Sequence, residues 1–117
     1  MHELSIAESL IKIIREEMAK HGLTKLLTAK IVHGQISAIV PEALETAFEI
    51  LTIGTPLEGA VIELETKPMV VRCRECGHEF SPTQEERILM PCPQCNTELG
   101  HEIIAGRELY IEHIEAE

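Results

Sequence analysis

Four cysteines are the residues of this 117-residue chain whose spacing points most directly to a chemical role. The two Cys-x-x-Cys pairs, "CRECG" and "CPQCN", contain Cys73, Cys76, Cys92 and Cys95. A two-residue gap lets a tight turn direct both sulfur atoms of a pair toward one ion, and Gly77 and Asn96 follow where positive φ is tolerated. Four thiolates around a d¹⁰ ion make a closed tetrahedral site, so we expect zinc. An iron site and paired redox disulfides are the alternatives.

The segment 68–97 differs in composition from the rest of the chain. It holds all four cysteines and four of the six prolines, which are Pro68, Pro82, Pro91 and Pro93. So short a segment cannot bury a core of its own, and we therefore expect the metal to organise it. The sequence predicts that this segment, 68–97, forms a zinc-binding domain inserted into an α+β domain that is built from 1–67 and 98–117.

The opening Met1-His2-Glu3 offers a second kind of metal chemistry. A free α-amine, the amide nitrogen of His2 and its imidazole can close fused chelate rings on one ion, with the amide nitrogen of Glu3 in reach as a fourth donor. Four nitrogen atoms in a plane suit Ni(II) or Cu(II), whereas zinc gains nothing from that geometry. Such a site needs Met1 retained and unblocked, and retention is expected because histidine is large. The alternative is an idle histidine at a frayed chain end.

Two helices and about three strands are predicted to position these residues. Apolar residues recur at three-and-four spacing from Leu4 to Met18, and Gly22 suits the end of that helix. A second apolar stripe over 41–51 follows Pro41, which favours the first turn of a helix. We expect strands at 23–39, with a bulge at Gly34, at 60–66 and at 107–115. The fold class is therefore α+β: two helices packed on a small, about three-stranded sheet, with an inserted zinc-ribbon-like four-cysteine module.

Composition excludes several classes of function. The formal net charge is −10, with twenty acidic residues against ten Lys and Arg, and aromatic residues are few, so neither the basic stripe nor the stacking platforms of a nucleic-acid binder are present. No apolar run is long enough for a membrane span, and early glutamates replace the basic residues of a secretory signal, so we expect a cytoplasmic protein. Ser5 and Ser9 with scattered histidines assemble no nucleophile and base, which argues against an enzyme.

Five stretches together carry a likeness to a known family: "MHELSIAESL", the glycine of "VHGQIS", "PEALETAFE…GTPLEGA", "CRECG…CPQCN" and "GRELYIEHIEAE". They resemble the HypA/HybF family of nickel metallochaperones, which supply nickel during [NiFe]-hydrogenase maturation. The resemblance implies that His2 is the essential nickel ligand, with the amine of Met1 and the backbone around Glu3 completing the site. It also implies structural zinc on the four cysteines.

The resemblance further implies two partners, a GTPase that drives nickel delivery and the hydrogenase large subunit. The chain has no G-x-x-x-x-G-K-[ST] loop, so nucleotide chemistry would come from the GTPase. A zinc-ribbon adaptor or interaction protein without a nickel function is the alternative from another class, and a dithiol redox enzyme is a third. The metal content of the purified protein separates the three.

Two positions depart from the family pattern, His33 and Gln35. We expect His33 to face solvent beside the sheet, the alternative being a donor near the nickel tip. His78 lies two residues beyond Cys76, and we expect it to be solvated or hydrogen-bonded in the loop rather than to replace a thiolate.

Overall fold

The computed structural model describes residues 2–83, 86 and 89–117, with the backbone alone at residue 2. The chain forms two compact units, the first from residues up to 32, 38–65 and 109–117, and the second from 33–37 and 66–108. The second unit extends beyond the cysteine segment 68–97 because a strand that follows the second cysteine pair belongs to its sheet.

Helix α1 (His2–Lys20) forms where the sequence places apolar residues on one face. Its buried positions follow the three-and-four spacing and are Ala7, Leu10, Ile14 and Met18. Gly22 ends the helix with φ +65°, and the N–H of Leu23 donates to the carbonyl of Met18 at 2.9 Å. This arrangement satisfies a carbonyl at the helix end, so the predicted helix and its glycine stop are confirmed.

Helix α2 (Pro41–Thr52) begins at the predicted proline, whose missing N–H costs nothing in a first turn. It buries Leu44, Ala47 and Phe48, and the hydroxyl of Thr52 donates to the carbonyl of Phe48 at 2.7 Å. These side chains join those of α1 in one apolar core. The second predicted helix is therefore confirmed.

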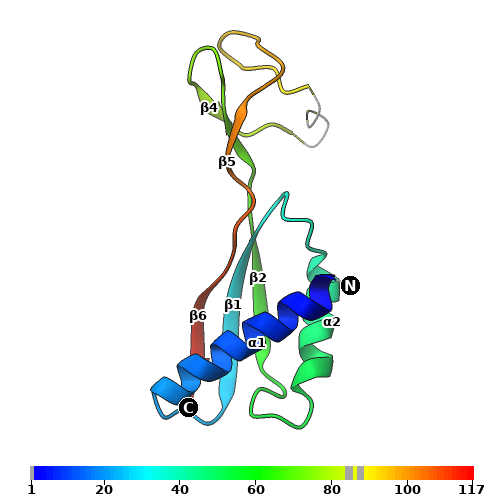
Figure 1. Cartoon of the computed structure of the whole chain (residues 1–117), viewed down its shortest axis with the longest axis vertical. Helices are drawn as coiled ribbons and strands as arrows, with labels where there is room; N and C mark the ends of the chain where they lie inside the picture. The colour runs from blue at the N-terminus through cyan, green and yellow to red at the C-terminus, as the bar shows by residue number, and fades with distance from the viewer. Residues whose placement is uncertain (1, 84–85, 87–88) are drawn as a thin grey trace. The chain divides into compact units, whose positions relative to one another are not determined.

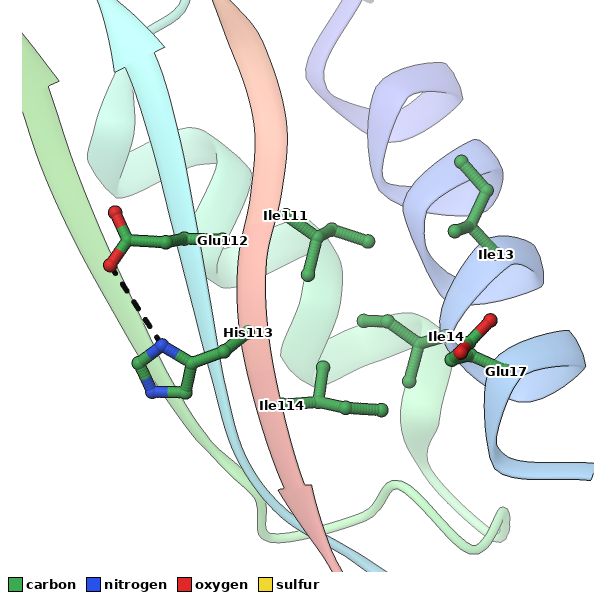
Figure 2. Close-up of a pocket in the computed structure, with 7 residues that line it drawn as sticks. All are labelled: Ile13, Ile14, Glu17, Ile111, Glu112, His113 and Ile114. Atoms are coloured by element: carbon green, nitrogen blue, oxygen red, sulfur yellow. Dashed lines mark ion pairs between the residues drawn. The ribbon is translucent and has the colours of Figure 1, made fainter. Parts of the chain in front are cut away.

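Three strands form the sheet of the first unit: β1 (Leu26–Gly34), β2 (Val61–Lys67) and β6 (Leu109–Ala116). They lie in the order β2-β1-β6, and helix α1 crosses over them (Figure 1). The arrowheads of β1 and β2 point the same way and that of β6 points the opposite way (Figure 2). Helix α2 connects the two parallel strands, as a parallel pair requires. The predicted class, two helices on a small three-stranded sheet, is confirmed.

The two faces of the sheet differ in character. Ile111 and Ile114 point from β6 toward α1, while Glu112 and His113 point away from it (Figure 2). On the face without helices, the ammonium of Lys30 lies 3.2 Å from a carboxylate oxygen of Glu65 and 3.3 Å from one of Glu112, so one cation joins all three strands.

The strand predicted at 23–39 is shorter in the structure. Gly34 is the last residue of β1 instead of a bulge, and the hydroxyl of Ser37 donates to its carbonyl at 2.7 Å to form a turn. A methyl group on Gly34 would overlap the backbone of Gly106. This close approach of two backbones is what requires glycine here.

The second unit contains a smaller antiparallel sheet. Strand β3 (Val70–Arg72) lies between β4 (Glu79–Phe80) and β5 (Glu102–Ala105). Val71 is opposite Phe80 on one side and Ile103 on the other, and it is fully buried. The cysteine pairs follow β3 and precede β5 in the chain, so this sheet holds the ends of both cysteine loops.

No helix in the described part of the chain is long and apolar enough to cross a membrane.

Candidate metal centre

The four cysteines meet in the second unit. Their sulfur atoms all lie within 4.8 Å of one another, and no other cluster of three or more metal-ligating side chains occurs among the described residues. Sγ of Cys73 is 3.4 Å from Sγ of Cys95, and Sγ of Cys76 is 3.5 Å from Sγ of Cys92. Each pair supplies one buried and one exposed thiol. The spacing in the sequence therefore predicted the cluster correctly.

The two cysteine loops have the same backbone geometry. In the first, the N–H of Cys73 donates to the carbonyl of His78 at 2.8 Å, and the N–H of Gly77 donates back to the carbonyl of Cys73 at 3.0 Å. In the second, Cys92 and Asn96 occupy the equivalent positions, with distances of 3.0 and 2.9 Å. Gly77 has φ +76° and Asn96 has φ +63°, which confirms the expected left-handed positions.

The surroundings of the cluster favour ionisation of the Cys73 thiol and oppose ionisation of the Cys76 thiol. Burial opposes ionisation of Cys73, but hydrogen bonds from the N–H groups of Cys76 and Glu75 outweigh it and lower the pKa of Cys73 to about 6. The N–H of His78 favours the thiolate of Cys76, yet the loss of water around its sulfur and the hydrogen bonds with the neighbouring thiols raise its pKa to about 12. Four thiolates at this spacing therefore require a cation among them.

The donor set fits a tetrahedral ion that prefers sulfur. Bonds of about 2.3 Å to a central zinc place tetrahedral sulfur ligands roughly 3.8 Å apart, and the sulfur separations of 3.4 Å and 3.5 Å in the two closest pairs are near that value. Four sulfur ligands leave no open position for a substrate, so a metal held here would support the loops rather than react.

His101 links the second cysteine loop to the small sheet, and it was not among the functional residues expected from the sequence. Its Nε2 lies 2.8 Å from the carbonyl of Met90 and 2.9 Å from that of Thr97, so this nitrogen carries the proton and donates to both. Its ring meets Phe80 edge to face at 5.3 Å between centroids. A single histidine six residues beyond the last cysteine gives no spacing signal, and only the folded loop reveals its role.

His78 and His33, the two other histidines with a possible role as metal ligands, contact side chains outside the thiol cluster. His78 stacks on Phe80, with centroids 6.2 Å apart and planes at 11°, and it is not part of the thiol cluster. His33 is only 3% exposed, and its Nε2 lies 3.2 Å from the hydroxyl of Thr66. The expectation that His33 faces solvent is therefore wrong, because it occupies the covered end of the central strand.

Two of the proposed nickel residues, His2 and Glu3, lie at the start of α1. Met1 and the side chain of His2 are outside the described residues. Helix α1 begins at His2, and the first amides of a helix have no intrahelical acceptor. Glu3 belongs to the first turn, and its Oε2 accepts a hydrogen bond from the N–H of Val40 at 3.2 Å.

Comparison with known proteins identifies the family. Residues 1–116 match the family model for HypA, described as "Hydrogenase/urease nickel incorporation, metallochaperone, hypA". Hydrogenase maturation factor HypA of Solidesulfovibrio magneticus is 52% identical over the full length of both chains, and that of Lawsonia intracellularis is 42% identical, again over the full length of both.

Two solved structures share the fold. One is the solution structure of the Ni metallochaperone HypA from Helicobacter pylori, with a TM-score of 0.67, 23% identity, and coverage of 97% of this chain and 96% of that one. The other is a solution structure of a HypA protein, with a TM-score of 0.69, 24% identity, and coverage of 99% and 96%. The whole-chain match and the full-length relatives together show that this chain belongs to the HypA family of nickel-incorporation metallochaperones.

Proposed function

We propose that this protein binds Ni(II) at Met1, His2 and Glu3 and delivers it to the large subunit of a [NiFe]-hydrogenase during maturation, together with a partner GTPase. The observation that carries the proposal is the match of nearly the whole chain to a family of nickel-incorporation metallochaperones. Its full-length relatives bear the name of hydrogenase maturation factors, which supports hydrogenase as the client.

The start of α1 is chemically suited to this role. The amides of His2 and Glu3 belong to the first turn, where a helix leaves its N–H groups without partners inside the helix. Their nitrogen atoms can therefore enter a metal site without breaking an intrahelical hydrogen bond. A free amine on Met1, these amides and the His2 imidazole supply the nitrogen donors that square-planar Ni(II) prefers.

Delivery needs an ion that partners can reach. A site at the chain tip lets an incoming ligand attack the ion, whereas a buried ion would have to await unfolding. The nickel is cargo here, and the protein supplies donors and a docking surface rather than catalysis. GTP hydrolysis would be the work of the partner, in the cytoplasm.

Zinc is the proposed occupant of the thiol cluster. Cys73, Cys76, Cys92 and Cys95 would hold it, and their closed sulfur set gives it a structural role. When bound, zinc supplies the positive charge that lets all four thiols ionise together. The two similar cysteine loops would then be fixed against each other through one ion.

The test is a nickel titration of three forms of the untagged protein: the unaltered chain, His2→Ala, and a chain with two extra residues ahead of Met1. Intact mass first verifies that Met1 is retained and unblocked. We expect one Ni(II) in a square-planar nitrogen environment for the unaltered chain and loss of tight uptake in both altered forms, with zinc content equal in all three.

Three results would refute the proposal. Sulfur coordination of the nickel would place the ion elsewhere, and unimpaired uptake by the extended chain would remove the role of the amine. Zinc without any nickel uptake by the unaltered chain would leave the zinc-ribbon adaptor as the function.

A further inference from the structure

Two sulfur contacts in the thiol cluster join one cysteine loop to the other. Sγ of Cys73 lies 3.4 Å from Sγ of Cys95, and Sγ of Cys76 lies 3.5 Å from Sγ of Cys92. A disulfide bond is about 2.05 Å long, so each contact needs an approach of roughly 1.4 Å to become covalent. The cluster therefore contains two cross-loop pairs, Cys73 with Cys95 and Cys76 with Cys92, in which small movements would bring the sulfur atoms to bonding distance.

The backbone of the loops favours these cross-loop pairs over a bond inside either loop. The N–H of Gly77 donates to the carbonyl of Cys73, and the N–H of Asn96 donates to the carbonyl of Cys92, so each turn is closed by its own hydrogen bond. A bond inside a Cys-x-x-Cys turn would have to draw its two sulfur atoms together across that closed turn. A cross-loop bond only moves the two loops toward each other and leaves both turns as they are.

Each cross-loop pair has one thiol that solvent reaches. Cys76 and Cys95 are exposed, while Cys73 is 2% and Cys92 is 0% exposed. Hydrogen peroxide therefore meets the two exposed thiols first, and a buried thiol of the other loop lies beside each of them. An accessible thiol next to a second thiol that can displace its oxidised form is the arrangement in which cysteine oxidation stops at a reversible disulfide.

The oxidation balances with hydrogen peroxide as the oxidant. Sγ of Cys95 attacks one peroxide oxygen and the O–O bond breaks, which gives a sulfenic acid at Cys95 and one water. Sγ of Cys73 then attacks that sulfur and the S–O bond breaks, so the hydroxyl group leaves as water with the proton of the Cys73 thiol. Each sulfur loses one electron. The pair formed by Cys76 and Cys92 reacts in the same way with a second molecule of peroxide.

We propose that hydrogen peroxide converts the two cross-loop pairs into disulfides, releases the zinc and leaves the second unit folded. The thiolate is the form of cysteine that binds a metal, so sulfur atoms joined in disulfides no longer hold the ion. The new bonds join residues 22 and 16 positions apart in the chain, and they replace the link between the loops that the ion would supply. The release of zinc rests on the occupant proposed above, whereas the pairing of the sulfur atoms does not.

Oxidation and chelation should therefore affect the second unit differently. Both remove the ion, but only oxidation leaves the two loops covalently joined. Bonds that close long stretches of chain restrict the unfolded state, whereas bonds inside the tight Cys-x-x-Cys turns would restrict it little. The oxidised protein should thus be free of zinc and still folded in 66–108.

The experiment treats the zinc-loaded full-length protein with hydrogen peroxide and measures released zinc with a chromophoric chelator. The chain has four cysteines, all in the cluster, so every disulfide reports on this site. After free thiols are alkylated, trypsin cuts behind Arg74 and separates Cys73 from Cys76, while Cys92 and Cys95 stay on one peptide. Cross-loop bonds join all three cysteine peptides in one species, whereas bonds inside the loops leave the third peptide separate.

Two double variants, compared without metal, assign the partners. Cys73→Ser with Cys95→Ser keeps the proposed pair of Cys76 and Cys92. The matched control, Cys73→Ser with Cys92→Ser, keeps Cys76 and Cys95, which are both exposed. If the observed contact decides the pairing, peroxide should form the disulfide at least about tenfold faster in the first variant, although the control offers two accessible thiols. Equal rates would overturn the assigned pairing.

For the unaltered chain we expect loss of all four thiols, release of one zinc and a single species of three linked peptides, all reversed by a dithiol reductant. Hydrogen exchange in 66–108 should stay within about threefold of the zinc-loaded protein after oxidation and rise at least about tenfold after chelation. Bonds inside the loops, bonds between two copies, sulfinic acid, unreacted thiols, or exchange as fast as after chelation would each overturn the proposal. Release of a metal other than zinc would refute the proposed occupant and leave the pairing standing.

Discussion

The N–H of Val40 donates a hydrogen bond to the carboxylate of Glu3, with Oε2 3.2 Å from the nitrogen. Val40 is the residue that caps α2, and no side chain of its own completes that cap. Glu3 thus stabilises the first turn of both helices: its carboxylate accepts the N–H at the start of α2, and its negative charge is favourable at the start of α1. Its carboxylate has a structural task, which leaves its backbone nitrogen as the part that nickel would use.

Glu3→Ala and Glu3→Pro should separate these two roles. Both remove the carboxylate, so both should lower the free energy of unfolding by about 1 kcal/mol. Only proline also removes the amide N–H, and it is tolerated in the first turn of a helix. We expect nickel titration to give normal stoichiometry for the alanine variant and weakened uptake with an altered d–d spectrum for the proline variant. Equal nickel binding by the two would exclude the Glu3 amide as a donor.

Removing zinc should affect the two units differently. Both helices lie in the first unit, whereas the second consists of short strands and the cysteine loops. Chelation is therefore expected to leave the helical circular dichroism signal largely intact while hydrogen exchange accelerates in 66–108. Cys92→Ser, which alters a fully buried thiol, should reproduce the effect. Collapse of the helical signal on chelation would contradict it.

Local patterns were sufficient for the parts of the fold that depend on neighbouring residues. Apolar periodicity predicted the buried face of α1, and Pro41 marked the start of α2. The Cys-x-x-Cys spacing predicted the cluster because each loop is a local turn. The two loops come together when all four sulfur atoms can bind the same ion. The nickel tip stays a prediction, since Met1 and the His2 side chain lie outside the described residues.

The errors arose where distant segments meet. The strand predicted at 23–39 continues past Gly34 because β-branched residues follow it, but in the structure the chain turns there and the backbone of Gly106 comes close. The sequence alone does not reveal that His33 is buried, because nothing in its own strand shows that this end of β1 is covered. His101 received no role because its acceptors, the carbonyls of Met90 and Thr97, converge only after the second loop has folded.

His101→Ala should loosen the second cysteine loop. It leaves the carbonyls of Met90 and Thr97 without their shared donor, at a cost of about 1–3 kcal/mol. We expect faster transfer of zinc to a chromophoric chelator, with partial recovery in His101→Gln, whose amide can donate from a similar position. His78→Ala is the matched control, since it removes a ring that also contacts Phe80. Equal rates for the two alanine variants would mean that ring packing alone matters.

The cation at the centre of the sheet should give a pH-dependent contribution to stability. Hydrogen bonding to Glu65, then to Glu112, raises the pKa of Lys30 above its ordinary value of 10.5. A raised pKa in the folded state means that the stabilisation is complete below pH 10.5 and is lost as the pH rises through the folded value.

Lys30→Met should therefore lower the melting temperature at pH 8, and the difference from the unaltered chain should shrink above pH 10.5. It should also shrink in about 1 M salt, which screens exposed ion pairs. Lys12→Met is the control, because no ion pair of Lys12 is found among the described residues. A difference that is unchanged by both pH and salt would point to the packing of the lysine stem.

Gly34→Ala tests the close approach of two backbones in the second unit. The added methyl group would overlap the carbonyl of Gly106, and backbone gives way less readily than a flexible side chain. The N–H of Gly34 also donates to the carbonyl of Glu108 at 2.7 Å, so a shift would strain that bond too. We expect denaturation to show a loss of at least about 3 kcal/mol. Gly54→Ala meets no atom within 4 Å but has φ +75°, so it should lose about 1 kcal/mol from backbone strain alone. If both variants lose the same amount, Gly34 is required for something other than contact with Gly106.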